Sequence, residues 1–394
     1  MSLRIEEVKT VKQIKAFIEL PIELYKNNKQ WIRPLDDDIE EVFDRERNKY
    51  FRHGDCTRWL CYSGERVVGR IAAFVDKKTA TAKGNKQATG GIGFFECVNE
   101  QEVANFMFEN AKQWLIEKGM EAMDGSINFG DRDRWWGLLA EGFEFEPNYR
   151  MPYTHPYYLE LFENYGFKLY FKQFTFWRPV TAPLPEIYAA KAERISKDPG
   201  YQFKHLKVSE IEKFAEDFRY IYNKAWAKHS GVREMPKAQA MAVMNSLKPV
   251  LDPDIIWFAY YKDEPAAFFI MIPELNQIFK HLNGKLKGKW DIWEKLKFLW
   301  LKKSGACRKM FGVAFGVIPE FQGKGLEGAI VVAAGKKIQP MGRYDEFEMN
   351  WIGDFNPKMS HVAESAGGKV RKVHHTYRYL FDPNAVFERA PMIE

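Results

Sequence analysis

The sequence predicts an α/β (α+β) protein made of two tandem copies of one domain. Two observations indicate this: a proline-rich segment near the midpoint, and two pairs of matching segments at nearly the same spacing. The chain has 394 residues, of which 46% are hydrophobic and 15% aromatic. This is enough apolar material for two cores. Each copy is expected to form a mixed, mostly antiparallel sheet flanked by helices.

The proline-rich segment is 179–185, which holds three prolines in seven residues. Proline fixes φ and lacks a backbone N–H, so this composition blocks both a helix and a central strand. We therefore interpret the segment as a linker. It divides the chain into a domain of residues 1–180 and a domain of residues 181–394.

The matching segments indicate an ancestral duplication. Trp59–Tyr62 resembles Trp257–Tyr260, and a short charged turn and a second apolar run follow each, as is typical of a strand–turn–strand unit. Residues 155–169 align with 356–370, with Pro, Glu, Gly and Lys at corresponding positions. The offsets, 198 and 201 residues, agree with each other. Such agreement at one period is the signature of an internal repeat.

A glycine-rich turn after residue 318 joins an apolar strand to an apolar helix. Backbone N–H groups in such a turn point into a common concavity, and the helix N-terminus adds about half a positive charge. A lysine adds a full charge, so the turn is suited to a diphosphate. The spacing is not that of a P-loop, and no acidic partner supports a dinucleotide fingerprint. The turn residues are Gln322, Gly323, Lys324, Gly325 and Gly328.

This string resembles the acyl-CoA-binding motif of the GNAT superfamily of N-acyltransferases, [Arg/Gln]-x-x-Gly-x-[Gly/Ala]. Gln322 and Gly325 match, whereas Glu327 departs from the usual Gly or Ala. The order of elements in both halves is also similar, so the chain resembles a tandem GNAT protein. The resemblance implies a CoA donor, expected to be acetyl-CoA, whose pantetheine arm pairs with the strand near Phe315 and Val317. The implied acceptor is an amine of a small molecule or peptide.

Only the second half is expected to bind CoA. In the first half the corresponding turn, residues 93–103, has neither the glycine cluster nor the lysine. Glu100 and Glu102 would repel a diphosphate there.

An acceptor amine must lose a proton, which requires a base. A strand at 345–351 would place Glu346, Glu348 and Asn350 on one face, so Glu348 is the first candidate base. Asp354 is the second, and a solvated strand face is the alternative for both.

The leaving thiolate needs a proton as well. The resemblance implies a tyrosine four residues before the glycine that closes the last helix, but Ala363 stands at that position. His361, two residues earlier, could replace the tyrosine only with rearrangement. The missing tyrosine favours a non-catalytic acyl-CoA-binding protein as the alternative, because the CoA-binding turn is kept.

A basic segment occupies residues 280–309, with ten Lys/Arg and two Asp/Glu. The net charge of the whole chain is only +6, so the remainder is slightly acidic, which argues against a protein that coats nucleic acid. Trp293, Leu296 and Trp300 form one stripe. We expect a helical insertion that packs this stripe on the domain; contact with an anionic membrane or with RNA are the alternatives.

The other signals favour a reduced, cytoplasmic protein. Four cysteines show no metal-ligand spacing, the N-terminus lacks an apolar signal region, and no apolar run is long enough for a membrane span. No metal site is expected. The leading function is N-acyl transfer; a non-catalytic acyl-CoA-binding protein and an aminoacyl-tRNA-dependent ligase are the alternatives. The glycine-rich turn argues against the ligase, which would not need it.

Overall fold

The computed structural model describes residues 2–81, 86–132, 134–226, 234–288 and 291–393. The strands of the first half are β1 (Leu3–Glu7), β2 (Gly54–Ser63), β3 (Arg66–Asp76), β4 (Thr89–Cys97), β5 (Ala122–Gly125), β6 (Leu138–Glu141) and β7 (Lys168–Pro179). Its helices are α1 (Val11–Leu24), α2 (Asp36–Phe43), α3 (Lys77–Ala80), α4 (Gln101–Glu117) and α5 (Tyr157–Tyr165).

The second half begins after the linker with α6 (Glu186–Ser196). Its strands are β8 (Tyr201–His205), β9 (Ile256–Tyr261), β10 (Glu264–Pro273), β11 (Lys309–Val317), β12 (Glu346–Gly353) and β13 (Lys369–Leu380). Its other helices are α7 (Ile211–Trp226), α8 (Lys237–Leu247), α9 (Asn276–Phe279), α10 (Ile292–Lys303), α11 (Leu326–Ile338) and α12 (Pro357–Ser365).

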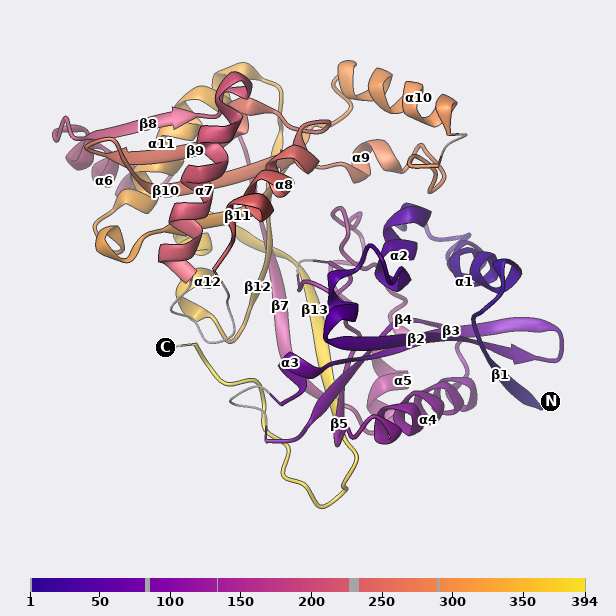
Figure 1. Cartoon of the computed structure of the whole chain (residues 1–394). Helices are drawn as coiled ribbons and strands as arrows, with labels where there is room; N and C mark the ends of the chain where they lie inside the picture. Colours follow the sequence, from indigo (N-terminus) through magenta and orange to yellow (C-terminus); the bar gives the residue numbers. More distant parts are fainter. Residues whose placement is uncertain (1, 82–85, 133, 227–233, 289–290, 394) are drawn as a thin grey trace.

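The strands form one continuous mixed sheet with helices on its faces (Figure 1). The strand order is β1-β2-β3-β4-β5-β13-β7-β12-β11-β10-β9-β8, and β6 pairs with β13 beside this path. Counted inward from the two edges of the sheet, β1 and β8 hold equivalent positions, as do β2 and β9, and so on to β13 and β7 at the centre. This symmetry confirms the predicted fold class and the predicted duplication.

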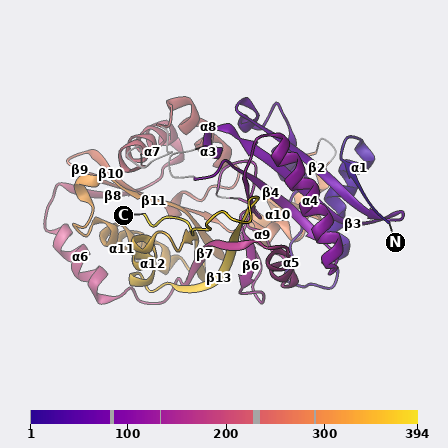
Figure 2. The ribbon, with the colours of Figure 1, turned by 90° about the horizontal axis from the view of Figure 1, so that it is seen from below.

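The two halves exchange their last strands. β7 pairs with β12 of the second half, β13 pairs with β5 of the first half, and the two exchanged strands pair with each other. The first and second halves lie at opposite ends of the common sheet, as the view in Figure 2 also shows. Neither segment, 1–180 or 181–394, therefore contains its complete sheet.

Residues 1–180 expressed alone should not form a native domain. The fragment would lack β13, which leaves the edges of β5 and β7 unpaired and open to aggregation. We expect binding of the dye ANS and loss of the near-ultraviolet circular dichroism that the full chain shows. A soluble, monomeric fragment with a cooperative unfolding transition would contradict this expectation.

Alternating side chains of the second half fill two cores, one on each face of the sheet. Trp257 and Phe269 point to the face covered by α6 and α11, whereas Phe258 and Phe268 point to the face covered by α7 and α8. Successive strand residues face opposite sides, so the unbroken apolar runs at 256–261 in β9 and 266–272 in β10 indicate strands that are buried on both faces.

The basic insertion between β10 and β11 differs from the prediction. The stripe expected to pack on the domain is exposed: Trp293 keeps 80% and Trp300 66% of its accessible surface. The helix α10 is instead held by Phe298 and Leu301, which are buried against a cluster containing Phe279. The helix carries apolar residues on two sides, and the side with Phe298 is the one that meets the protein.

Candidate functional site

The sheet opens between the two parallel strands of the second half. β11 and β12 pair from Lys309 with Glu346 as far as Gly312 with Met349. Beyond that point β11 continues along β10, while β12 continues along β7. The two strands therefore diverge, and the edge of β11 that faced β12 is no longer covered by a strand.

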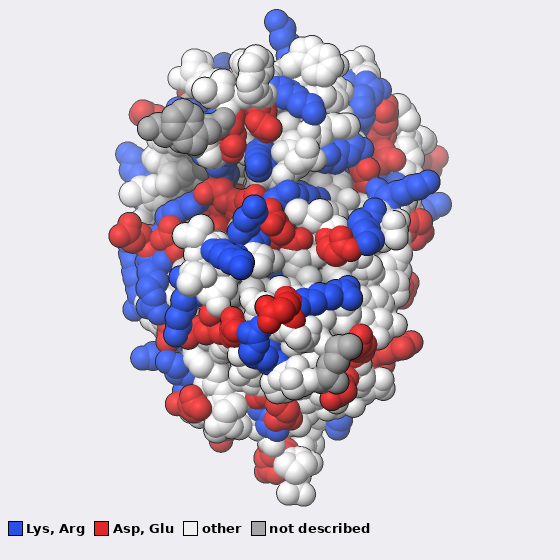
Figure 3. Space-filling model, turned by 90° about the vertical axis from the view of Figure 1, so that its right-hand side faces the viewer, with Lys and Arg blue, Asp and Glu red and all other residues white. Residues whose placement is uncertain are grey.

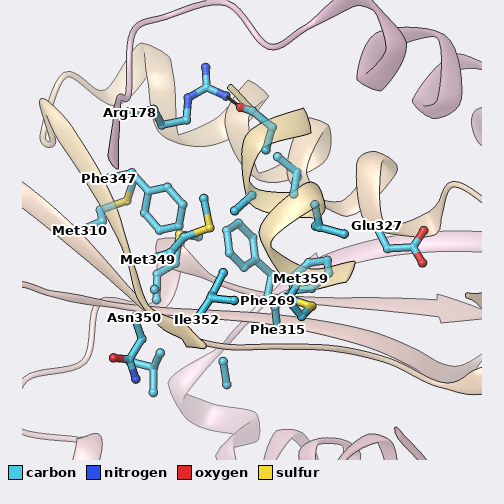
Figure 4. Close-up of a pocket in the computed structure, with 18 of the residues that line it drawn as sticks. Arg178, Phe269, Met310, Phe315, Glu327, Phe347, Met349, Asn350, Ile352 and Met359 are labelled. Atoms are coloured by element: carbon cyan, nitrogen blue, oxygen red, sulfur yellow. Dashed lines mark hydrogen bonds between the residues drawn. The ribbon is translucent and has the colours of Figure 1, made fainter. Parts of the chain in front are cut away.

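A cavity of about 460 Å³ lies at this divergence. In Figure 4 the labelled phenylalanine and methionine side chains converge on it from the strands and from the helix side. The lining is mainly apolar, with side chains from β10, β11, β12, α11 and α12: Phe269, Met271, Met310, Phe315, Phe347, Met349, Ile352, Val331, Ala334, Ile338, Met359, Val362 and Ala363.

Charged groups lie at the periphery of the cavity (Figure 4). Glu327 is the one carboxylate among the described lining residues. Arg178 is buried and donates to the carbonyl of Ala366 at the end of α12 and, at 2.6 Å, to that of Ala182 in the linker. Burial lowers the pKa of Arg178. Its hydrogen bonds tie the linker to α12 on one side of the cavity.

The glycine-rich turn has the backbone that the sequence predicts for an anion site, but a side chain already occupies part of it. Gly323 and Gly325 have positive φ angles of 69° and 90°, which favour glycine. Glu327, in the first turn of α11, accepts a hydrogen bond at 3.1 Å from the N–H of Gly323. A carboxylate thus satisfies a donor that a phosphate oxygen could use.

Helix α6 brings two cations to the same turn. Arg194 donates to the carbonyl of Lys324. A Cβ built on Gly325 would lie 3.1 Å from Arg194 Nη2 and 3.2 Å from Lys191 Cγ, so both side chains cover the turn. Together with Lys324 and the free N–H groups of the first turn of α11, they form a positively polarised surface. These residues fit a diphosphate, provided that Glu327 turns away.

The residues predicted to hold the cofactor occupy different places. Phe315 lines the cavity. The carbonyl of Val317 accepts from Gln322 Nε2 at 2.9 Å, and Val317 pairs with β10. Gly328 lies against Tyr188 of α6, which a Cβ at that position would approach to 3.2 Å. Glu327 links the two regions, because it both lines the cavity and bonds to the turn.

Glu348, the first candidate base, lies outside the cavity lining. Its side chain is fully buried and forms ion pairs at 2.7 Å with both Lys309 and Lys372, with Arg371 at 3.6 Å. Burial alone would raise the pKa of Glu348, but the charges of Lys372 and Lys309 outweigh it and hold that pKa far below its ordinary value. Such a carboxylate is always ionised and binds protons weakly.

The other two predicted catalytic residues are also outside the lining. Asp354 is paired with Arg389, and His361 is exposed on α12. Asn350, which the sequence places on the same strand as Glu348, is among the lining residues. A register shift between Met349 and Ile352 interrupts the regular pairing of β12 at this point.

Tyr188, which the sequence did not single out, lies beside the position of the missing tyrosine. It comes from α6, lines the cavity and donates from its hydroxyl to the carbonyl of Val362 at 3.2 Å, one residue before Ala363. Burial, with a smaller contribution from the charge of Glu327, raises the pKa of Tyr188. Because the contact joins residues 174 positions apart, no local sequence signal could have indicated it.

The corresponding opening in the first half is filled. β4 and β5 pair as far as Gly91 with Asp124. Beyond this point Ile127 donates from its N–H to the carbonyl of Ile92 at 2.8 Å. A Cβ on Gly93 would lie 1.7 Å from the carbonyl oxygen of Ile127, so glycine is required there. The cavity nearby measures only about 70 Å³.

Among the described residues, no group of three or more His, Cys, Asp and Glu side chains is placed to hold a metal ion. The helices of the described segments also include none with both the length and the apolar character needed to cross a bilayer.

No family model matches the chain. Two curated proteins align with almost all of it. A bacterial ceramide synthase of Caulobacter vibrioides is 27% identical over 379 residues, which cover 95% of this chain and 97% of the relative. The protein YghO of Escherichia coli is 26% identical over 372 residues, 92% of each chain.

Solved structures give the fold. The GCN5-related glucosamine N-acetyltransferase region of a fungal GH3 β-N-acetylglucosaminidase matches with a TM-score of 0.56 and 11% identity, over 96% of this chain and 38% of that one. A tandem GNAT protein from the clavulanic acid biosynthesis pathway matches with a TM-score of 0.54 and 9% identity, over 98% of this chain and all of that one. The chain has the fold of a tandem GNAT N-acetyltransferase.

Proposed function

We propose that the protein is an N-acyltransferase that moves a long acyl chain from acyl-CoA to an amine. The observation that carries the proposal is the apolar cavity of about 460 Å³ where β11 and β12 diverge, next to the glycine-rich turn. Both features lie in the same half of the chain. We propose that the glycine-rich turn binds the diphosphate of CoA and that the cavity holds the hydrophobic chain.

The donor would lie along the uncovered edge of β11. Beyond Gly312 this edge offers backbone groups that the amides of a pantetheine arm can bond. The diphosphate would sit at the N-terminus of α11, close to Lys191, Arg194 and Lys324. Binding requires Glu327 to release the N–H of Gly323 and to move its negative charge away from the phosphates.

The size of the cavity favours a long chain over the acetyl group expected from the sequence. The volume falls in the range of about 300–1,000 Å³ that is usual for pockets enclosing a whole small molecule. The pantetheine arm along β11 would fill part of this volume, and a long acyl chain would contact the apolar lining that remains. Each buried methylene of a longer chain contributes about 0.8 kcal/mol.

The acceptor we propose is the amine of a long-chain amino alcohol. The Caulobacter relative is named a bacterial ceramide synthase, which describes a protein that makes a lipid in which a long-chain amino alcohol is N-acylated. The identity of 27% extends over 95% of the chain, and an apolar cavity is suited to such a product. We therefore propose a lipid amine in place of the small-molecule or peptide amine that the sequence predicts.

The chemistry requires two proton movements. The amine nitrogen attacks the thioester carbonyl, a C–N bond forms, the C–S bond breaks, the nitrogen loses a proton and the thiolate of CoA gains one. We assign the second proton to Tyr188, whose hydroxyl lies next to the position occupied by Ala363. Glu348 and Asp354 remain predictions for the base, and His361 remains a prediction for the group that replaces the missing tyrosine, although none of the three lines the cavity.

The test uses the full-length protein with a long-chain acyl-CoA and sphinganine, with CoA release and the N-acylated product as readouts. Tyr188→Phe removes the hydroxyl but keeps the ring, so single-turnover transfer should fall by about 10²- to 10⁴-fold while acyl-CoA affinity stays the same. Tyr165→Phe, in a hydroxyl contact of the first half, is the matched control and should leave the rate unchanged.

Two results would change the proposal. A Tyr188→Phe variant with the wild-type rate would remove Tyr188 as the proton donor. If the protein binds acyl-CoA tightly but acylates no amine in a panel, the proposed enzyme activity is wrong and the protein is a non-catalytic acyl-CoA-binding protein.

A further inference from the structure

The exposed side of α10 is a continuous apolar surface. Five large side chains keep more than half of their accessible surface: Ile292, Trp293, Leu296, Leu299 and Trp300. At 3.6 residues per turn, successive residues are rotated by about 100°, so these five positions fall within an arc of roughly 120°. The two buried anchors, Phe298 and Leu301, lie on the opposite side of the helix. The helix is thus fixed to the protein by one face and presents the other to the surroundings.

Positive charge borders this apolar arc. Lys295 lies on one flank of the arc, Lys297 on the other, and Lys302 and Lys303 lie at the C-terminal end. All four are exposed, and three of them donate to backbone carbonyls. In the described segments none of the four forms an ion pair with a carboxylate. Within the described part of the chain, these four lysines therefore border the apolar arc without a carboxylate partner.

We propose that α10 docks the protein on the surface of an anionic lipid bilayer. A helix with tryptophan and leucine on one side and lysines along its borders lies in the interface, with its apolar side inserted and its charges at the headgroups. Tryptophan in particular is enriched at this depth. In Figure 3 the end of the molecule that carries α10 lies at the top, where white and blue surfaces lie side by side and red side chains appear just below them. The rest of that face mixes red and blue.

The charge distribution favours a membrane over a second protein copy. A twofold contact would bring the lysines of two α10 helices together, and like charges at an interface are repulsive. Negatively charged headgroups would instead compensate them. The proposal concerns residues remote from the acyl-CoA motif and stands on its own, because binding to lipid can be measured without any acyl transfer.

The experiment is sedimentation of the full-length protein with vesicles, without substrates. One set of vesicles is pure phosphatidylcholine, and the other contains phosphatidylglycerol as well. We expect binding to the anionic set that weakens as salt is added. Lys295→Glu and Lys303→Glu should each lower the partition coefficient by roughly fivefold or more, since a basic residue near an anionic surface contributes about 1 kcal/mol. Trp293→Ser combined with Trp300→Ser should abolish binding.

Control variants test whether any exposed residue would have the same effect. Lys12→Glu and Val386→Ser change an exposed charge and an exposed apolar residue elsewhere and should bind as the wild type does. Equal binding of the wild type and the tryptophan variant would overturn the proposal. The proposal would also be overturned if the wild type formed a dimer in analytical ultracentrifugation and the tryptophan variant did not. Binding to RNA without binding to anionic vesicles would overturn it as well.

Discussion

Replacing Glu348 by glutamine should lower the free energy of unfolding by about 3–5 kcal/mol, the usual cost of removing one partner from a buried ion pair. The carboxylate is fully buried and lies 2.7 Å from both Lys309 and Lys372, which are themselves nearly inaccessible. The substitution leaves two buried cations without their counterion. Denaturant unfolding at neutral pH measures the change.

Glu346→Gln is the matched control on the same strand. Its carboxylate pairs with Arg371 but keeps 37% of its side-chain surface exposed, so the substitution should cost no more than about 1 kcal/mol. A structural role and a catalytic role of Glu348 predict different results for this substitution. If Glu348→Gln unfolds like the wild type and loses acyl transfer instead, Glu348 is the general base that the sequence predicted, and the structural role is wrong.

Filling the cavity with a bulky side chain should weaken the binding of a long-chain acyl-CoA. Ala334 lies on α11, is fully buried and lines the cavity, so Ala334→Trp would occupy space proposed for the acyl chain. Excluding three or four methylenes, at about 0.8 kcal/mol each, lowers the affinity for a long-chain acyl-CoA roughly 100-fold. Affinity for CoA itself should change little.

Lys336→Trp serves as the control for this variant. Residue 336 is on the same helix but exposed, so the same bulky side chain points away from the cavity. Competition between CoA and long-chain acyl-CoA gives both affinities in one experiment. Equal losses for the two ligands would mean that Ala334→Trp distorts the turn and that the cavity does not hold the chain.

Repeats and backbone requirements could be predicted from the sequence because they are local. The offset of 198 residues between Trp59 and Trp257 anticipated the symmetry of the sheet. The glycines of the turn anticipated positive φ at Gly323 and Gly325. Each of these signals is carried by short runs of residues that can be recognised without knowing which distant segments are in contact.

The parts that were missed depend on contacts between distant segments. Each half could have paired its own last strand, β7 or β13, with its own sheet. Which strand pairs with which half is therefore decided by contacts between distant segments. The register shift in β12 interrupts the regular pairing that an alternating sequence pattern assumes. For α10, both sides are apolar, so the helical period could not say which one would be buried. Tyr188 reaches the cavity only because α6 packs on α11.

The central claim is that one acyl-CoA binds in the second half with its chain in the cavity. Titration calorimetry of the full-length protein with CoA, acetyl-CoA and acyl-CoAs of increasing chain length, each below its micelle concentration, tests it most directly. We expect one site per chain and an affinity that rises about fourfold for each buried methylene until the cavity is full. Two equal sites, or an affinity for acetyl-CoA as high as that for the long chains, would contradict the claim.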